Sequence, residues 1–205
     1  MDQHVHEALT ENAAGPPRAR GRPRSPEADE AILKAAWELL TEGRYDRMTF
    51  EAIADRAGCS RPTIYRRFRN KVELVRALVE PLTGAMEPVV RADGGPRNSL
   101  LSYLEEFAGY LTEGGGNAIM ALWQARREDE EMSAMLDDIY VQGRRPYVQM
   151  LAQLSERRAA DDAYVVLVDA MLGAVMFRCV HRLKPISRPE LEVLVDQAMA
   201  AAMKI

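Results

Sequence analysis

Side chains that can donate hydrogen bonds are concentrated between residues 61 and 71. They are Arg61, Thr63, Tyr65, Arg66, Arg67, Arg69 and Lys71. Arginine, lysine and hydroxyl groups are the donors that proteins use on phosphates and on base edges, and an aromatic side chain lies among them here. This segment therefore predicts a surface that binds nucleic acid. The alternative is a solvated basic face on an ordinary helical hairpin.

The distribution of charge along the chain favours the first interpretation. The 205 residues carry a net charge of −4, yet residues 18–76 hold 14 Lys and Arg against 9 Asp and Glu. The remainder is correspondingly acidic. Such asymmetry predicts one basic module that meets a polyanion and a larger acidic module that does not.

Helix signals surround the donor segment. Ser25, Pro26 and an acidic first turn predict a helix start, apolar residues then recur at helical spacing to about Thr41, and Gly43 ends the helix. Thr49 is expected to cap a short helix that ends at Ala57–Gly58.

A second short helix follows this tight turn. Ser60 is expected to cap it, with Pro62 in its first turn. Asn70 and Glu73 resemble a capping box that opens a longer helix, which Pro81, Gly84 and Pro88 are expected to kink or end. Two short helices joined by a glycine-containing turn, after a supporting helix, constitute a helix-turn-helix.

One stretch of the chain has a specific pattern. The helix AILKAAWELL precedes MTFEAIADRAGCSRPTIYRRFRNKVELV, in which Thr-Ile-Tyr-Arg-Arg-Phe is followed by Asn-Lys and then by a leucine. Over residues 25–80 this pattern resembles the DNA-binding domain of the TetR family of bacterial regulators. The resemblance implies an all-α fold, with an N-terminal helix-turn-helix three-helix DNA-binding domain and a C-terminal helical ligand-binding and dimerisation domain.

The resemblance also implies roles for matching positions. Phe68, Ala54, Gly58 and Ile64 fall on packing positions, and Tyr65 and Lys71 fall where the family typically contacts phosphates. The full set expected to contact DNA is Thr49, Arg61, Pro62, Thr63, Tyr65, Arg66, Arg67 and Lys71.

Residues 1–24 are expected to form a flexible basic arm. Arg20, Arg22 and Arg24 resemble the core of an AT-hook, in which arginines enter a narrow A·T minor groove. The alternative is a disordered tail that adds non-specific affinity by counterion release. Both interpretations predict stronger DNA binding. His4 and His6 lack the other ligands that a metal site needs.

Residues 81–205 are expected to form the helical ligand-binding and dimerisation domain. Residues 93–96 are predicted to be a linker, a helix marked by Leu100 to Leu111 is ended by Gly114–Gly116, and a short helix covers residues 118–126. A longer apolar stripe runs from Met132 to Leu154, where Gly143 and Pro146 are expected to bend the helix.

A ligand pocket is expected between the middle helices, mostly apolar with a few polar groups. The candidates are Tyr103, Phe107, Tyr110, Met120, Trp123, Tyr147, Met176, Phe177 and His181. The alternative for most of them is a place in the core. Asp169, isolated in an apolar segment, is equally an interface contact, a ligand contact or an outward-facing residue.

The last two predicted helices carry the apolar surface that a dimer needs. Residues 163–181 are apolar on nearly every side, and Ser187 with Glu190 forms a capping box for the final helix. The resemblance implies a four-helix dimer interface. Its candidate residues are Ala170, Gly173, Ala174, Leu191, Leu194, Val195, Ala198 and Ala202. The alternative is burial of both helices within one subunit.

Several other classes of protein are disfavoured. The sequence lacks a phosphate-binding glycine loop, a nucleophile elbow and a zinc-binding pattern, so we expect no catalytic residue, no metal and no cofactor. Glu128–Glu131 is read as a solvated helix start. The segment 163–180 contains Asp169 and Arg178 and is barely long enough for a membrane span, and no apolar stretch of signal-peptide length lies in residues 1–30. Two distant cysteines, Cys59 and Cys179, agree with a cytoplasmic location.

These observations predict a homodimeric transcriptional regulator. We expect a repressor that occupies a palindromic operator on double-stranded DNA and leaves it when a small apolar or amphipathic inducer binds. Two alternatives come from other classes of protein. One is a protein that coats DNA without sequence preference or inducer, and the other is an all-helical enzyme or small-molecule carrier.

Overall fold

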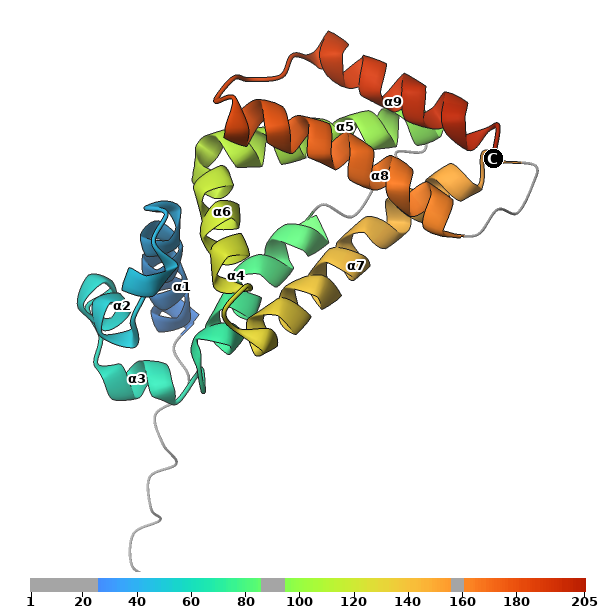
Figure 1. Cartoon of the computed structure of the whole chain (residues 1–205). Coiled ribbons are helices and arrows are strands. Elements are labelled where there is room, and N and C mark those ends of the chain that lie inside the picture. Colours follow the sequence, from blue (N-terminus) through green and yellow to red (C-terminus); the bar gives the residue numbers. More distant parts are fainter. Residues whose placement is uncertain (1–25, 86–94, 156–160) are drawn as a thin grey trace, which may run out of the picture.

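The computed structural model of the chain describes residues 26–85, 95–155 and 161–205. Every regular element in these ranges is a helix (Figure 1). The all-α fold expected from the sequence is therefore present. The predicted cap at Ser25 and the predicted break at Pro88 lie outside the described residues.

The first four α-helices follow the predicted order. They are α1 (Pro26–Thr41), α2 (Phe50–Ala57), α3 (Arg61–Tyr65) and α4 (Lys71–Ala85), with a single 3₁₀ turn at Tyr45–Arg47 before α2. Helices α1, α2 and α3 gather at one end of the molecule, and α4 leads away from them (Figure 1). Helix α4 is continuous past Pro81 and Gly84, so neither residue ends it, and the domain boundary predicted after residue 80 falls inside a helix.

The caps of the two short helices, α2 and α3, are those that the sequence predicts, with one exception. The Thr49 hydroxyl accepts a hydrogen bond from the N–H of Ala52 at 3.1 Å, and Gly58 ends α2 in the left-handed conformation at φ 64°. The Ser60 hydroxyl instead contacts the Thr63 hydroxyl at 2.9 Å and makes no cap hydrogen bond to the backbone. Its predicted role as a side-chain cap is therefore wrong.

The start of α4 has half of the predicted capping box. The N–H of Glu73 donates to Asn70 Oδ1 at 2.9 Å, as expected, but the Glu73 carboxylate accepts from the N–H of Arg69 at 2.7 Å. The second bond is thus displaced by one residue. Both the backbone and the side chain of Glu73 are thus hydrogen-bonded to the turn before α4.

The remaining helices build the larger part of the molecule. They are α5 (Gly95–Tyr110), α6 (Gly116–Ala125), α7 (Glu130–Ala152), α8 (Asp161–Met176) and α9 (Arg188–Ala202). Single π turns, Leu111–Gly115 and Phe177–His181, follow α5 and α8. Helices α5, α8 and α9 lie together at the end opposite α1–α3, and α6 and α7 extend between the two ends (Figure 1).

The start of α5, the course of α7 and the cap of α9 were each predicted from the sequence. Gly95 and Pro96 belong to the first turn of α5, so the linker prediction is wrong for them, and residues 93–94 lie outside the described ranges. Helix α7 is uninterrupted at Gly143 and Pro146. The capping box of Ser187 and Glu190 is confirmed, and Asp129 caps α7 by accepting from the N–H of Met132 at 3.0 Å.

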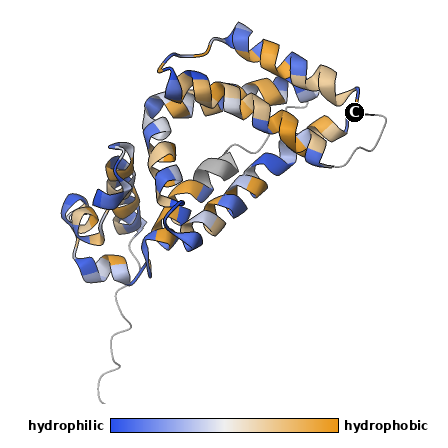
Figure 2. Cartoon of the chain, in the orientation of Figure 1, coloured by the Kyte–Doolittle hydropathy of each residue, from blue (hydrophilic) through white to orange (hydrophobic). Residues whose placement is uncertain are grey.

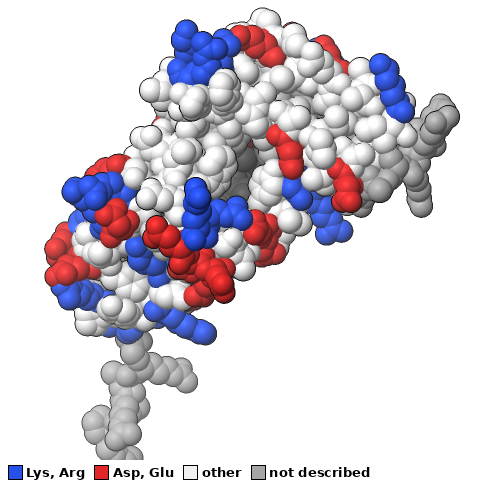
Figure 3. Space-filling view, viewed as in Figure 1, with Lys and Arg blue, Asp and Glu red and all other residues white. Residues whose placement is uncertain are grey.

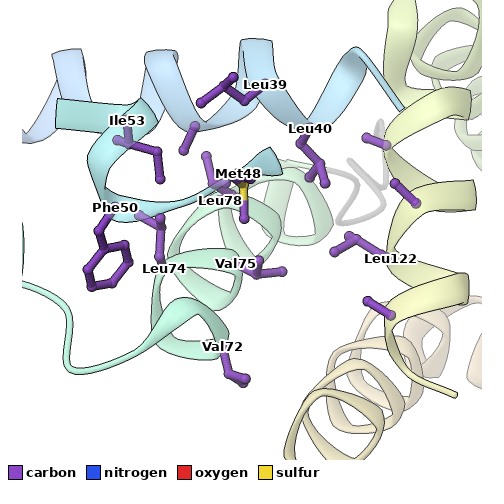
Figure 4. Packing of buried hydrophobic residues seen from close by; sticks show 14 of the residues in the cluster. Leu39, Leu40, Met48, Phe50, Ile53, Val72, Leu74, Val75, Leu78 and Leu122 are labelled. Atoms are coloured by element: carbon purple, nitrogen blue, oxygen red, sulfur yellow. The ribbon is translucent and has the colours of Figure 1, made fainter. Parts of the chain in front are cut away.

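Two hydrophobic cores hold the helices together. The first core joins α1–α4 to α6 and to the first half of α7, with Met48 and Ile53 completely buried (Figure 4). The second core joins α5, the second half of α7, α8 and α9, and contains a stack of Tyr103 on Tyr147 with ring centroids 3.6 Å apart. Apolar residues are most continuous along α8 (Figure 2).

Candidate nucleic-acid interface

Four of the predicted DNA contacts lie on the exposed side of α3 and at its C-terminal end. Arg61, Pro62, Tyr65 and Arg66 are exposed, and the Tyr65 side chain is 60% accessible. The Tyr65 ring meets the buried ring of Phe50 edge to face at 4.9 Å, which holds it against α2. Its hydroxyl is therefore presented on a fixed ring beside two exposed guanidinium groups.

Hydrogen bonds within the motif arrange this surface before any ligand binds. Thr63 is half-buried, and its hydroxyl contacts Ser60 Oγ and accepts from Arg66 Nη2 at 3.2 Å. Arg61 pairs with Glu51 of α2. A phosphate that approached Arg61 would compete with that carboxylate, and exposed pairs of this kind are weak.

Thr49 is placed to serve both the fold and a phosphate. It is exposed at the N-terminus of α2, where its hydroxyl oxygen accepts from the backbone. The hydroxyl proton is left to donate outward, and the partial positive charge of the helix N-terminus favours an anion. Thr49 is thus exposed at the helix N-terminus where the predicted phosphate contact would lie, and the contact itself stays a prediction.

Arg67 and Lys71 depart from the prediction. The Arg67 side chain is only 10% accessible, pairs with Asp29 of α1 and donates to the Thr63 carbonyl at 2.9 Å. The half-buried Lys71 ammonium donates to the Tyr45 carbonyl at 2.7 Å and lies 3.6 Å from the centre of the Tyr45 ring. Neither side chain belongs to the exposed face of α3, because Arg67 is held against α1 and Lys71 against the turn at Tyr45.

Burial shifts the pKa values of Lys71 and of the neighbouring Tyr45. It lowers the pKa of the Lys71 ammonium, and the negative charges of Asp46 and Asp129 partly oppose that effect. Burial, with the nearby charges of Asp129 and Glu131, raises the pKa of Tyr45 to about 12. Through its contacts with Tyr45, the Lys71 side chain connects the turn at Tyr45–Arg47 to the start of α4.

Arg69 is a further exposed cation that was not among the predicted DNA contacts. It occupies the turn between α3 and α4, where only its backbone N–H is engaged by Glu73. Its position within the donor segment, residues 61–71, was the feature of the sequence that could have identified it as a candidate DNA contact. Arg20, Arg22 and Arg24 lie outside the described residues.

Charges of both signs surround the motif. In the view of Figure 3, Lys and Arg alternate with Asp and Glu over the end formed by α1–α3. Arg56 pairs with Glu42 at 2.6 Å and Arg44 with Asp46 at 2.9 Å. The donors on α3 are thus a local feature rather than part of one uniformly basic surface in this view.

The predicted ligand-binding residues do not converge on one cavity. Tyr103 and Tyr147 are buried in the second core, Phe107 stacks on Tyr103 at 6.4 Å, and Tyr110 packs near Trp37 at 5.8 Å. These side chains stabilise the helical packing of a single chain.

The other predicted ligand-binding residues are mostly on the surface. Met120, Trp123 and Phe177 are 48%, 47% and 56% accessible. His181 is exposed and stacks on Phe177 at 4.9 Å, and Met176 is half-buried against the second core. Of all nine candidates only Phe177 lines either of the two cavities described, a site of about 250 Å³ beside Arg178 and Leu194. The prediction of one shared pocket is not met.

Asp169 joins two helices of the same chain. Its carboxylate accepts from the Tyr140 hydroxyl at 2.6 Å and lies 3.4 Å from Arg144, both on α7. The Arg144 guanidinium also lies over the Tyr140 ring at 4.7 Å. The isolated acid of α8 thus has an intramolecular role that the sequence interpretation did not include.

The dimer candidates divide into two groups. Leu191, Val195, Ala198 and Ala202 are buried within their own chain, so the prediction that they form an intersubunit surface is wrong. Ala170 and Gly173 are exposed, and Ala174 and Leu194 are half-buried. The exposed Val166 of α8 and Val193 of α9, 64% and 53% accessible, were missed.

Helix α8 with its following turn is strongly apolar yet poorly covered. Residues 162–181 are long and apolar enough to cross a membrane by length and composition, but only a third of the most apolar window is buried. Val166, Ala170, Gly173 and Phe177 are all exposed and follow one another at helical spacing. An apolar stripe therefore runs along the outside of α8.

Sequence comparisons extend over most of the chain. Residues 32–78 match the family model described as bacterial regulatory proteins, tetR family. The chain is 30% identical over 164 residues to the HTH-type transcriptional regulator YdeS of Bacillus subtilis, covering 78% of this chain and 81% of that one. It is 36% identical over 84 residues to the DNA-binding transcriptional repressor TetR of Mycobacteroides abscessus, covering 41% and 42% of the two chains.

Solved structures show the same fold. A transcriptional regulator from Pseudomonas aeruginosa PAO1 superimposes with a TM-score of 0.71 at 20% identity, covering 87% of this chain and 91% of the other. A TetR-family regulator from Rhodococcus gives a TM-score of 0.70 at 17% identity, covering 87% and 100%. Taken with the helix-turn-helix and its exposed donors, these similarities assign the chain to the TetR family, as a DNA-binding transcriptional regulator and not an enzyme.

Proposed function

We propose that the protein is a homodimeric repressor of the cytoplasm that occupies a palindromic operator and releases it when a small apolar or amphipathic molecule binds. The observation that carries the DNA-binding part is the exposed face of α3, where Tyr65 stands beside Arg61 and Arg66. A helix of this kind presents its first residues to base edges in the major groove while neighbouring donors hold phosphates.

A dimer is proposed from the uncovered stripe on α8. Val166, Ala170, Gly173 and Phe177 present apolar surface to solvent in the single chain, and the small residues in the middle allow a second helix to approach closely. Val193 of α9 extends the surface. A two-fold dimer would place two α3 helices for successive half-sites of one operator.

Release requires that the ligand bind better to a conformation in which the two α3 helices are wrongly spaced. Helix α4 is the proposed lever because it leaves the DNA-binding end and contacts α7. Asn70 Nδ2 donates to Glu131 at 3.2 Å, and Arg76 lies 3.3 Å from Asp138. The arginines at 20, 22 and 24 are proposed to add affinity through the arm.

Selection from randomised duplex DNA at about physiological salt tests the specific-operator part. We expect the bound pool to converge on a two-fold symmetric sequence. A pool that shows no enrichment, from protein shown to be folded and dimeric, would instead favour DNA coating without sequence preference.

Sedimentation velocity tests the dimer. Gly173→Arg places a charge in the middle of the α8 stripe, where the single chain has open space, so we expect a folded monomer. The matched control is Val141→Arg, at an exposed apolar position of α7, which should remain dimeric. Dissociation of both variants, or of neither, would contradict an α8 interface.

A further inference from the structure

A cavity separate from the predicted ligand residues lies between the glycine turn that follows α5 and the turn that ends α8. Its volume is about 280 Å³, and its walls include Leu111, Asn117, Cys179, Val180, Leu183 and Lys184. This volume is just below the range of about 300–1,000 Å³ found for small-molecule sites. The cavity therefore suits a compact ligand.

The walls define the chemistry of such a ligand. Leu111, Val180 and Leu183 supply apolar surface, and Lys184 is the one charged residue among those that line the cavity. Within the described parts of the chain, the Lys184 ammonium has no ion-pair or hydrogen-bond partner, and Lys184 is exposed. The site thus combines an apolar body with a single available positive charge.

Leu183 combines a strained backbone conformation with an exposed apolar side chain. It is the non-glycine residue that adopts a positive φ among the described residues, at 51°, and it is 82% accessible. It follows the last turn of α8, where the N–H of Lys184 returns to the Arg178 carbonyl at 3.1 Å. Glycine is the usual residue at such a helix end. The presence of a large apolar side chain at this strained position, on the cavity wall, is a second indication of a ligand.

The cavity adjoins the DNA-binding end of the molecule. The Asn117 side-chain amide donates to the carbonyl of Thr41, the last residue of α1, at 3.2 Å. A β-carbon added at Gly114 would lie 3.5 Å from Thr41 Cγ2. One residue of the cavity wall, Asn117, is thus hydrogen-bonded to the helix that supports α2 and α3.

We propose that this cavity binds a small amphipathic carboxylate. The carboxylate pairs with Lys184 and the apolar chain lies between Leu111, Val180 and Leu183. An occupant would lie next to Asn117 and could alter its hydrogen bond to Thr41. Binding itself is independent of the proposed function, whereas any effect on operator affinity depends on it.

Calorimetric titration with the straight-chain carboxylates from butanoate to octanoate tests the site, with hexanol and hexylamine as neutral and cationic comparisons. We expect at least one carboxylate to bind and the amine not to bind. Lys184→Glu should weaken carboxylate binding at least tenfold. The matched control Lys204→Glu makes the same charge change at an exposed residue near the C-terminus and should bind as the original protein does. Absence of binding by every carboxylate, or equal loss in both variants, would overturn the proposal.

Cys179 reports whether binding occurs in this cavity. In a Cys59→Ser protein it is the remaining cysteine, and it lines the cavity. The carboxylate that binds should slow alkylation of Cys179 by iodoacetamide severalfold, and should not do so in the Lys184→Glu variant. An unchanged alkylation rate at saturating carboxylate would locate the binding elsewhere and refute the assignment.

Operator selection without carboxylate keeps the two proposals separate. If carboxylates protect Cys179 but no operator is selected, the cavity assignment stands and the repressor proposal fails. If an operator is selected and no carboxylate binds, only the cavity assignment fails.

Discussion

Two neighbouring arginines of the DNA-binding motif have different surroundings. Arg66 is exposed and held only by Thr63, whereas Arg67 is nearly buried between Asp29 and the Thr63 carbonyl. Both were predicted to contact DNA. The structure places Arg67 between α3 and α1, whereas we propose that Arg66 contributes to DNA binding.

Substitution of each arginine by methionine separates these roles. We expect Arg67→Met to lower the free energy of unfolding by about 2 kcal/mol, because it removes a largely buried charged partner of Asp29. Arg66→Met should leave stability within about 0.5 kcal/mol and reduce the salt dependence of DNA binding by about one phosphate contact per subunit. Urea denaturation and salt-dependent DNA titration measure the two effects. A stability loss confined to Arg66→Met would reverse the assignment.

The buried tyrosines predict a loss of stability in alkali. Burial raises the pKa of Tyr110 to about 12, above its ordinary value of 10.0. Because the unfolded chain ionises first, the contribution of Tyr110 to stability is complete below pH 10 and is lost as the pH rises through about 12.

The variant Tyr110→Phe has no phenol to ionise, so its stability should fall less steeply over the same pH range. Denaturation midpoints between pH 9 and 12 provide the measurement. Because Tyr45 and Tyr103 titrate in both proteins, the difference in slope is the relevant quantity. Parallel slopes would show that Tyr110 ionises equally in the folded and unfolded states.

At the scale of helices, apparently similar caps differ in their hydrogen bonds. Thr49 accepts from a backbone N–H, whereas the Ser60 hydroxyl contacts another hydroxyl. We expect Thr49→Ala to cost about 1 kcal/mol of unfolding free energy and Ser60→Ala less than half of that. Chemical denaturation of the two variants is sufficient. Equal losses would mean that Ser60 caps α3 in solution.

At the helix end at Leu183, we expect a substitution to stabilise the protein rather than to destabilise it. Leu183→Gly should raise the free energy of unfolding by about 1 kcal/mol, because glycine adopts the positive φ without steric cost. Leu183→Ala, which keeps the β-carbon and removes mostly exposed surface, should give no such gain. Thermal unfolding compares the two, and stabilisation by alanine alone would exclude backbone strain as the cause.

Periodicity in the sequence predicted which face of a helix is apolar but not which partner covers that face. Leu191, Val195, Ala198 and Ala202 were correctly read as one apolar side of the last helix and wrongly assigned to a second subunit. In α8 almost every side is apolar, so the exposed stripe that includes Val166 could not be distinguished from the buried one.

The candidate site shows the same limit. Exposed Tyr65 and Arg66 follow from the motif, whereas the burial of Arg67 and Lys71 depends on Asp29 and Tyr45, which are distant in sequence. Contacts of this kind are decided by tertiary packing. No local pattern in the donor segment records them.

At the scale of the whole molecule, the glycine turn after α5 sets how closely its segments can approach. A β-carbon at Gly115 would lie 2.5 Å from the Tyr110 ring and 2.6 Å from the Tyr110 carbonyl oxygen. One at Gly109, in the same region, would meet nothing within 4 Å. The two positions form a matched pair.

We expect Gly115→Ala to lower the melting temperature by several degrees, since overpacking costs about 1–3 kcal/mol. Gly109→Ala should raise it by about 2 °C because alanine is favoured over glycine inside a helix. Scanning calorimetry measures both. A neutral Gly115→Ala would show that the turn can relax around an added methyl group.

The first hydrophobic core has a consequence for how such proteins can be recombined. Leu122 of α6 belongs to the same buried cluster as Leu40 and Leu74 (Figure 4). Met132 of α7 is part of this cluster too. A chimera that grafts only residues 26–85 onto another regulator would leave half of an apolar contact facing a foreign surface. A DNA-binding domain that is to be exchanged between regulators would therefore need to include the residues of α6 and α7 that pack against it. The segment to be transplanted is larger than the segment that touches DNA.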